Sequence, residues 1–170
     1  GSETFSGIVH YNGKQFAGAT TCSECHSGIA ESHMSTAHFF ASSQADTSTV
    51  RGNFEPPNNV FNLNDHVGVE IVMRDSGLYQ VAIVDGEKKV FKRIDIVIGS
   101  GRKGQTFLRW DSSSLFQLPV SHNSAGDQWT NSPGYPTDRL VFDRNVPARC
   151  MECHSTFMRV GRAVGGNETF

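Results

Sequence analysis

All four cysteines of the chain fall in two short motifs of one design, CSECH at residues 22–26 and CMECH at residues 150–154. Two thiols at this spacing can add to the vinyl groups of a haem, and the histidine that follows reaches the iron from one face. The spacing therefore predicts two covalently attached haem c groups. Their attachment points would be Cys22, Cys25, Cys150 and Cys153, and their proximal iron ligands His26 and His154.

Two other uses of CxxC pairs stay open as alternatives. A four-cysteine zinc site usually places its pairs about 15–20 residues apart, whereas the interval here is 150 − 22 = 128 residues. A disulfide within each pair is the second alternative. Neither needs a histidine directly after the second cysteine, and 7 histidines in 170 residues would place one at both positions by chance with a probability of roughly 0.002.

The composition limits the class of protein. A chain of 170 residues has the length of one domain, but its hydrophobic fraction of 37% is low, so a group other than side chains is expected to fill part of the interior. The formal charge of −2 gives no basic field for nucleic acid, and no apolar run reaches the roughly 20 residues of a membrane-spanning helix. Gly1 and Ser2 resemble an expression scar, so a secretory signal peptide would already have been removed from this sequence. We expect an exported protein because of the cysteine motifs.

Between the two motifs the sequence favours β-structure. β-branched and aromatic runs predict strands, and the segments Asp75–Gly77, Asp85–Gly86 and Ser100–Gly101 carry the turn residues that would separate them. An antiparallel meander is the simplest arrangement. The predicted strands are 67–73, 78–84, 89–91, 94–98, 105–110 and 114–119.

The first motif is followed by a segment of helical composition, residues 27–41. Proline-rich segments at 56–59 and 132–136 mark loops on either side of the β-rich centre. The predicted fold class is thus α+β. We expect a single dihaem domain over residues 1–170, with haem-binding helical or loop segments near both ends flanking a central antiparallel β meander.

Three further stretches, IGSGRKGQTFLRWDSSSLFQLPVS (98–121), WTNSPGY (129–135) and RCMECH (149–154), resemble the multihaem cytochrome c superfamily. The modules often attached to tetratricopeptide repeats are the most similar, and the resemblance covers most of residues 18–158. It implies electron transfer outside the cytoplasm, in the periplasm or extracellular space. It also implies that His38, in the element Thr36-Ala37-His38-Phe39, is an axial ligand.

The candidates for distal iron ligands are the remaining histidines and the methionines; of the methionines, Met34 is expected to pack against porphyrin, and Met158 is a poor ligand because it follows His154 by only four residues. A straight helix over 27–38 would place His38 about 18 Å along the axis from His26, which favours His38 as a ligand of the second haem; a break at Gly28 would instead fold the segment over the first. His66 precedes a predicted strand that could aim it at the other iron. His122 and His33 stand where the similar family usually has aromatic residues, and they are further candidates.

Two strong protein ligands on each iron would make the chain an electron carrier, whereas an open iron could bind a substrate or gas. We therefore expect electron transfer by two bis-histidine haems, with redox proteins or other multihaem cytochromes as partners. This chemistry demands no catalytic base or nucleophile. The alternatives are a haem enzyme, either a peroxidase or a small-molecule reductase, and a gas or redox sensor module of a larger chain.

Overall fold

The structure is a computed structural model that describes residues 9–74, 77–161 and 163–170. The chain forms two compact units, Gly1–Phe40 and Ala41–Phe170, where the sequence predicted one domain. We call them the N-terminal unit and the β domain. Each unit carries one CxxCH motif. The expected scar at residues 1–2, and residues 75–76 of one predicted turn, lie outside the described residues.

The N-terminal unit contains helices α1 (Gly18–Ser23) and α2 (Ser27–Met34). Helix α2 is shorter than the predicted segment 27–41. It ends where two hydroxyls bond its last carbonyls: Ser35 Oγ donates to Ser32 O at 2.8 Å, and Thr36 Oγ1 donates to His33 O at 2.7 Å. Gly28 lies within α2 and does not break it. No helix of the described residues is long and apolar enough to cross a membrane.

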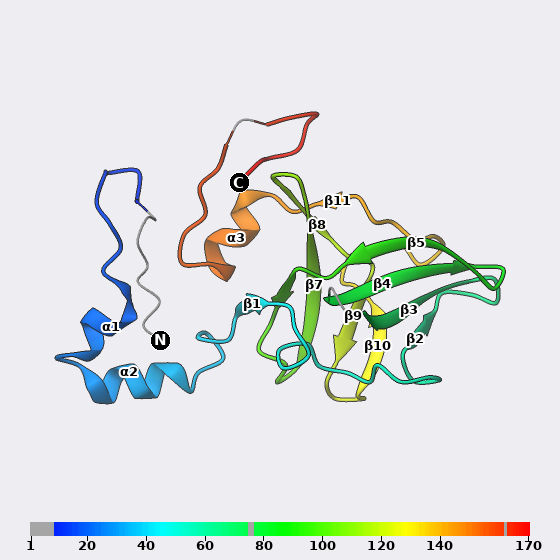
Figure 1. The fold of residues 1–170 in the computed structure, drawn as a ribbon, viewed down its shortest axis with the longest axis horizontal. Coiled ribbons are helices and arrows are strands. Elements are labelled where there is room, and N and C mark those ends of the chain that lie inside the picture. Colours follow the sequence, from blue (N-terminus) through cyan, green and yellow to red (C-terminus); the bar gives the residue numbers. More distant parts are fainter. Residues whose placement is uncertain (1–8, 75–76, 162) are drawn as a thin grey trace. The chain divides into compact units, whose positions relative to one another are not determined.

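The β domain contains two antiparallel sheets (Figure 1). The four-stranded sheet is a meander, as the sequence predicted, in the order β2-β3-β4-β5. Its strands are β2 (Val60–Asn62), β3 (Val67–Arg74), β4 (Gly77–Val84) and β5 (Glu87–Arg93).

The seven-stranded sheet is not a simple meander. Its path is β1-β6-β7-β8-β11, and β9 pairs with both β7 and β10. The strands are β1 (Ser42–Gln44), β6 (Ile96–Ile98), β7 (Gly104–Asp111), β8 (Ser114–Gln117), β9 (Val120–Asn123), β10 (Gln128–Asn131) and β11 (Arg144–Asn145). Helices and antiparallel sheets thus coexist, as expected for the α+β class.

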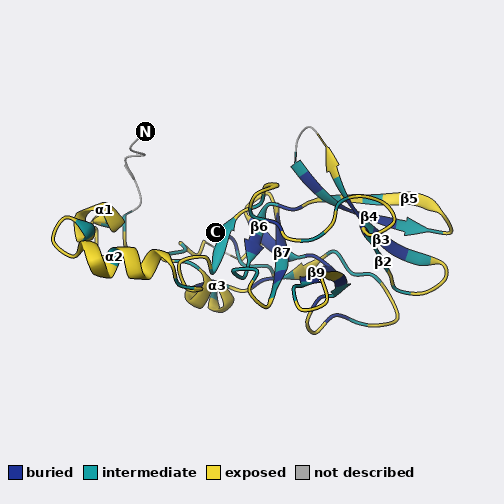
Figure 2. Ribbon diagram, turned by 90° about the horizontal axis from the view of Figure 1, so that it is seen from below, coloured by how far each residue is buried: buried dark blue, intermediate teal, exposed yellow. Residues whose placement is uncertain are grey.

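The two sheets share one hydrophobic core. Ile71 of β3 and Phe107 of β7 are fully buried members of the same cluster, and Figure 2 shows buried residues along the strands of both sheets. A polar side chain also joins the sheets: Gln80 of β4 donates from Nε2 to Val120 O at 2.7 Å and accepts from Val120 N at 3.1 Å. Both polar ends of this buried amide are satisfied, so it links the sheets without leaving an unpaired group.

Candidate haem-attachment sites

The first motif spans the junction of the two N-terminal helices. Cys22 lies in α1, Cys25 follows in the turn, and His26 is the N-cap residue of α2. Two backbone hydrogen bonds shape this turn: His26 N donates to Cys22 O at 3.0 Å, and Ala30 N donates to His26 O at 2.9 Å. Both cysteines are free thiols, and all three side chains are exposed. The motif therefore presents its three reactive groups to an incoming ligand.

Exposed apolar side chains lie on α2 and directly after it in the N-terminal unit. Neither α1 nor α2 has a buried residue, and Figure 2 draws both mostly in the colour of exposed residues. Four large hydrophobic side chains near the motif are exposed: Ile29 by 69%, Met34 by 47%, Phe39 by 44% and Phe40 by 51%. Such side chains gain free energy when an apolar surface covers them. A covalently held porphyrin fits this requirement.

The second motif lies on α3 (Ala148–His154) of the β domain. Cys150, Cys153 and His154 are exposed, and both cysteines are free thiols. Met151, between the cysteines, points the other way and is only 3% exposed. It packs in a cluster with buried residues of β7 and β8, Leu108 and Leu115. One face of the helix is thus anchored in the core, while the face with the attachment groups stays accessible.

Two candidate distal ligands lie in the N-terminal unit. His33 belongs to the last turn of α2, where its ring makes an edge contact with Phe39 at 5.7 Å between centroids. His38 lies in the turn that follows and is exposed. Because α2 ends at Met34, the straight helix over 27–38 that favoured His38 as a ligand of the second haem does not form. The length of α2 therefore does not support the prediction that His38 binds the iron of the second haem.

The structure places His66, which was predicted to bind the first haem when His38 binds the second, in the β domain. His66 lies in the loop between β2 and β3, and its Nδ1 is 2.9 Å from Asp85 Oδ1 in the turn after β4. Both side chains are exposed. These residues belong to the four-stranded sheet, whereas α3 packs on the seven-stranded one. In Figures 1 and 2, the β4–β5 turn and α3 occupy opposite ends of the β domain.

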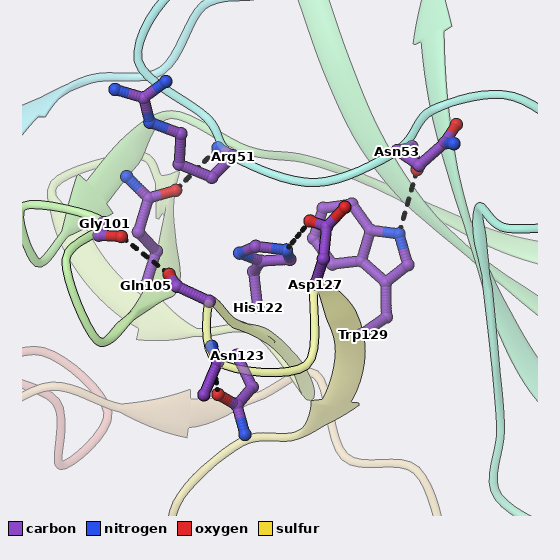
Figure 3. A network of polar contacts seen from close by, with 10 residues as sticks. Arg51, Asn53, Gly101, Gln105, His122, Asn123, Asp127 and Trp129 are labelled. Atoms are coloured by element: carbon purple, nitrogen blue, oxygen red, sulfur yellow. Dashed lines mark hydrogen bonds and ion pairs between the residues drawn. The ribbon is translucent and has the colours of Figure 1, made fainter.

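His122 has a different setting from that of an accessible ligand (Figure 3). It lies on β9 and is 3% exposed. Its Nε2 is 3.0 Å from Asp127 Oδ1, and its ring packs edge-on against Trp129 at 5.3 Å. The loop residue Gly52 closes over both rings. His122 thus contributes to the packing of the β domain, and its role as an iron ligand stays a prediction.

The stretch 98–121, which resembles the cytochrome family, serves the architecture of the β domain. Gln105 is buried and binds the preceding loop through two hydrogen bonds, from Arg51 N at 2.7 Å and to Thr49 O at 2.8 Å. Ser121 and Ser132 share a buried hydrogen bond of 2.7 Å that joins this stretch to the WTNSPGY segment. The strand pattern in the sequence did not predict these hydrogen-bond partners, because they depend on which strands become neighbours in the fold.

Tyr135 ends the WTNSPGY segment and provides a pH-dependent prediction. Its hydroxyl donates to Gln117 O, and burial raises the pKa of this phenol above its usual value. The unfolded chain therefore releases the proton first, near pH 10, and stability is lost as the pH rises further. We expect the free energy of unfolding to fall above pH 10 with a Tyr135 contribution of about 1.4 kcal/mol per pH unit. Tyr135→Phe should remove this contribution in denaturant titrations, whereas Tyr79→Phe should retain it.

Within the described ranges, no three histidine, cysteine, aspartate or glutamate side chains converge as they would around a bare metal ion. The comparisons with known proteins also leave the family undetermined. No protein-family model, no curated protein and no solved structure matches the chain. The assignment of function consequently depends on the two motifs and on what surrounds them.

Proposed function

We propose that this chain is a dihaem c-type cytochrome that transfers single electrons. The observation that carries the proposal is the repetition of one arrangement in both units: two free, exposed thiols followed directly by an exposed histidine. The two motifs rest on different supports, a pair of short helices in one case and a helix anchored on a sheet in the other. A shared pattern on two unlike supports favours a shared ligand over a shared structural role.

The residues of each motif have separate tasks in this proposal. Cys22 and Cys25, and likewise Cys150 and Cys153, would hold haem through thioether bonds, and His26 and His154 would supply nitrogen ligands. The haem iron supplies the one-electron chemistry when bound. The exposed apolar side chains around α2 would cover the porphyrin and exclude water, which affects the reduction potential. Bis-histidine coordination, with His38 as one distal ligand, would keep the iron closed to small molecules.

The proposed partners are redox proteins, including other multihaem cytochromes, that meet the chain outside the cytoplasm. Both motifs are exposed at the surface of their own unit. Encounters between electron-transfer proteins usually bury less than about 1,200 Å² and are transient. A small exposed haem edge would suffice for such an encounter, so the proposal needs no deep substrate cleft.

A visible spectrum with carbon monoxide tests the proposal. In protein made by a host that attaches haem, we expect a c-type α-band after dithionite reduction and no spectral change when carbon monoxide is added. The His38→Ala variant should then bind carbon monoxide at one of its two haems, because one iron loses a distal ligand. The same carbon monoxide measurement on His66→Ala tests His66 as the second predicted distal ligand.

The outcomes separate the candidate functions. Absence of the α-band would overturn the cytochrome proposal and favour zinc or disulfides at the cysteine pairs. A carbon monoxide response in the unaltered protein would contradict two closed irons and would favour a haem enzyme or gas sensor. An unaltered response in His38→Ala would remove His38 from the iron ligands.

A further inference from the structure

The backbone carbonyl of His154 receives a hydrogen bond from a residue far away in the sequence. The donor is the hydroxyl of Ser42, the first residue of β1. Pairing with β6 holds β1 in place around this hydrogen bond. Ser42 pairs with Ile98 of β6, and Gly99 N donates to Ala41 O at 2.8 Å. The start of the β domain is thereby attached to the end of the helix that carries the second motif.

This bond lies at the end of α3 that most needs a partner. The last carbonyls of a helix have no intrahelical donors, and His154 is the final residue of α3. The rest of α3 is held elsewhere, because Met151 is buried in the core and Glu168 accepts a hydrogen bond from Ala148 N. Ser42 therefore supplies the restraint that acts on the peptide of His154 itself.

From this geometry we infer that Ser42 is a positioning residue for the second haem, an inference that depends on the proposed function. By holding the carbonyl of His154, Ser42 fixes the direction in which the imidazole leaves the backbone. An imidazole free to tilt would donate less electron density to a bound haem iron and would stabilise its oxidised state less. Loss of the hydroxyl should consequently raise the reduction potential of this haem and leave that of the other haem unchanged.

Potentiometric titration of the haem-loaded full chain tests the inference. In Ser42→Ala we expect the reduction equilibrium of one of the two haems to shift about threefold toward the reduced state. This shift corresponds to a rise of ~28 mV in the reduction potential for one electron. Ser42→Thr keeps a hydroxyl and should restore the original potential. Ser43→Ala is the matched control, because the Ser43 hydroxyl has no hydrogen-bond partner among the described residues. Unchanged potentials in Ser42→Ala would overturn the inference.

Hydrogen exchange on the haem-free chain separates this inference from the proposed function. Loss of Ser42 should speed exchange of the Ser155 amide, whose acceptor is Met151 O in the last turn of α3, by about fivefold. The same exchange rate in Ser42→Ala and the unaltered chain would refute the restraint itself. Failure of the unaltered protein to bind any haem would instead refute the proposed function, and the exchange result would still stand.

Discussion

Replacement of Cys150 and Cys153 by alanine is expected to halve the covalent haem content, from two groups to one per chain, while the β domain stays folded. Both thiols are exposed, so their removal takes no packing away from the core. Met151 remains to anchor α3 in its cluster. Pyridine haemochrome absorbance per chain measures the haem content, and thermal unfolding followed by far-ultraviolet circular dichroism measures the fold.

The matched variant, Cys22→Ala with Cys25→Ala, should lose the same amount of haem but have a different structural effect. The two helices of the N-terminal unit have no buried residue, so under the proposed function the bound haem would cover the apolar side chains of this unit. We expect limited proteolysis to cut within residues 9–40 of this variant and to spare the β domain. Equal resistance of both double variants, or two haems retained in either, would contradict the prediction.

This expected difference follows from how each motif is supported. In the second motif the residue after the first cysteine is Met151, which is buried, whereas the corresponding Ser23 of the first motif leaves α1 with no anchor in the described part of its unit. If both motifs hold haem as proposed, attachment would add to an existing fold in the β domain. In the N-terminal unit it would supply the apolar surface that packing requires.

The strand pattern of the β domain could be read from the sequence to a large extent. The six predicted strands correspond to β3–β8, because these strands have β-branched and aromatic residues in long enough runs. Strands β1, β9, β10 and β11 consist mostly of polar residues, and β2 has only two apolar residues, so no apolar run marks them in the sequence. The division into two sheets was also missed, since turn signals say where a strand ends and not which strand it joins.

Less of the ligand set could be predicted. Histidine spacing identified His122 as a candidate, but only the fold shows that this side chain is buried beside Asp127 and Trp129. The helix expected over 27–41 was too long, because composition does not register the hydroxyls of Ser35 and Thr36 that bond the last carbonyls. The CxxCH motifs, unlike the distal ligands, could be recognised from the sequence. The spacing that haem attachment requires lies within five residues and depends on no long-range contact.

Gly52→Ala is expected to destabilise the β domain by about 3 kcal/mol or more, from backbone strain and overpacking together. Gly52 has a φ of +116°, which side chains rarely adopt, and it lies directly over the packed rings of His122 and Trp129. A Cβ there would be 2.5 Å from Trp129 Cζ2 and 2.9 Å from His122 Cδ2. Both rings are buried and fixed by hydrogen bonds, Trp129 to Asn53 O and His122 to Asp127, so neither can move aside cheaply.

Gly86→Ala is the control, because Gly86 also has a positive φ, +79°, but a Cβ there would meet nothing within 4 Å. It should cost only the backbone strain, about 1 kcal/mol. Urea unfolding of the haem-free chain gives both free energies, with the fluorescence of Trp110 and Trp129 following the transition. Equal destabilisation by the two substitutions would mean that the loop over His122 yields easily. A larger cost at Gly52 would show that this loop is a rigid part of the β domain, and that His122 remains enclosed beneath it.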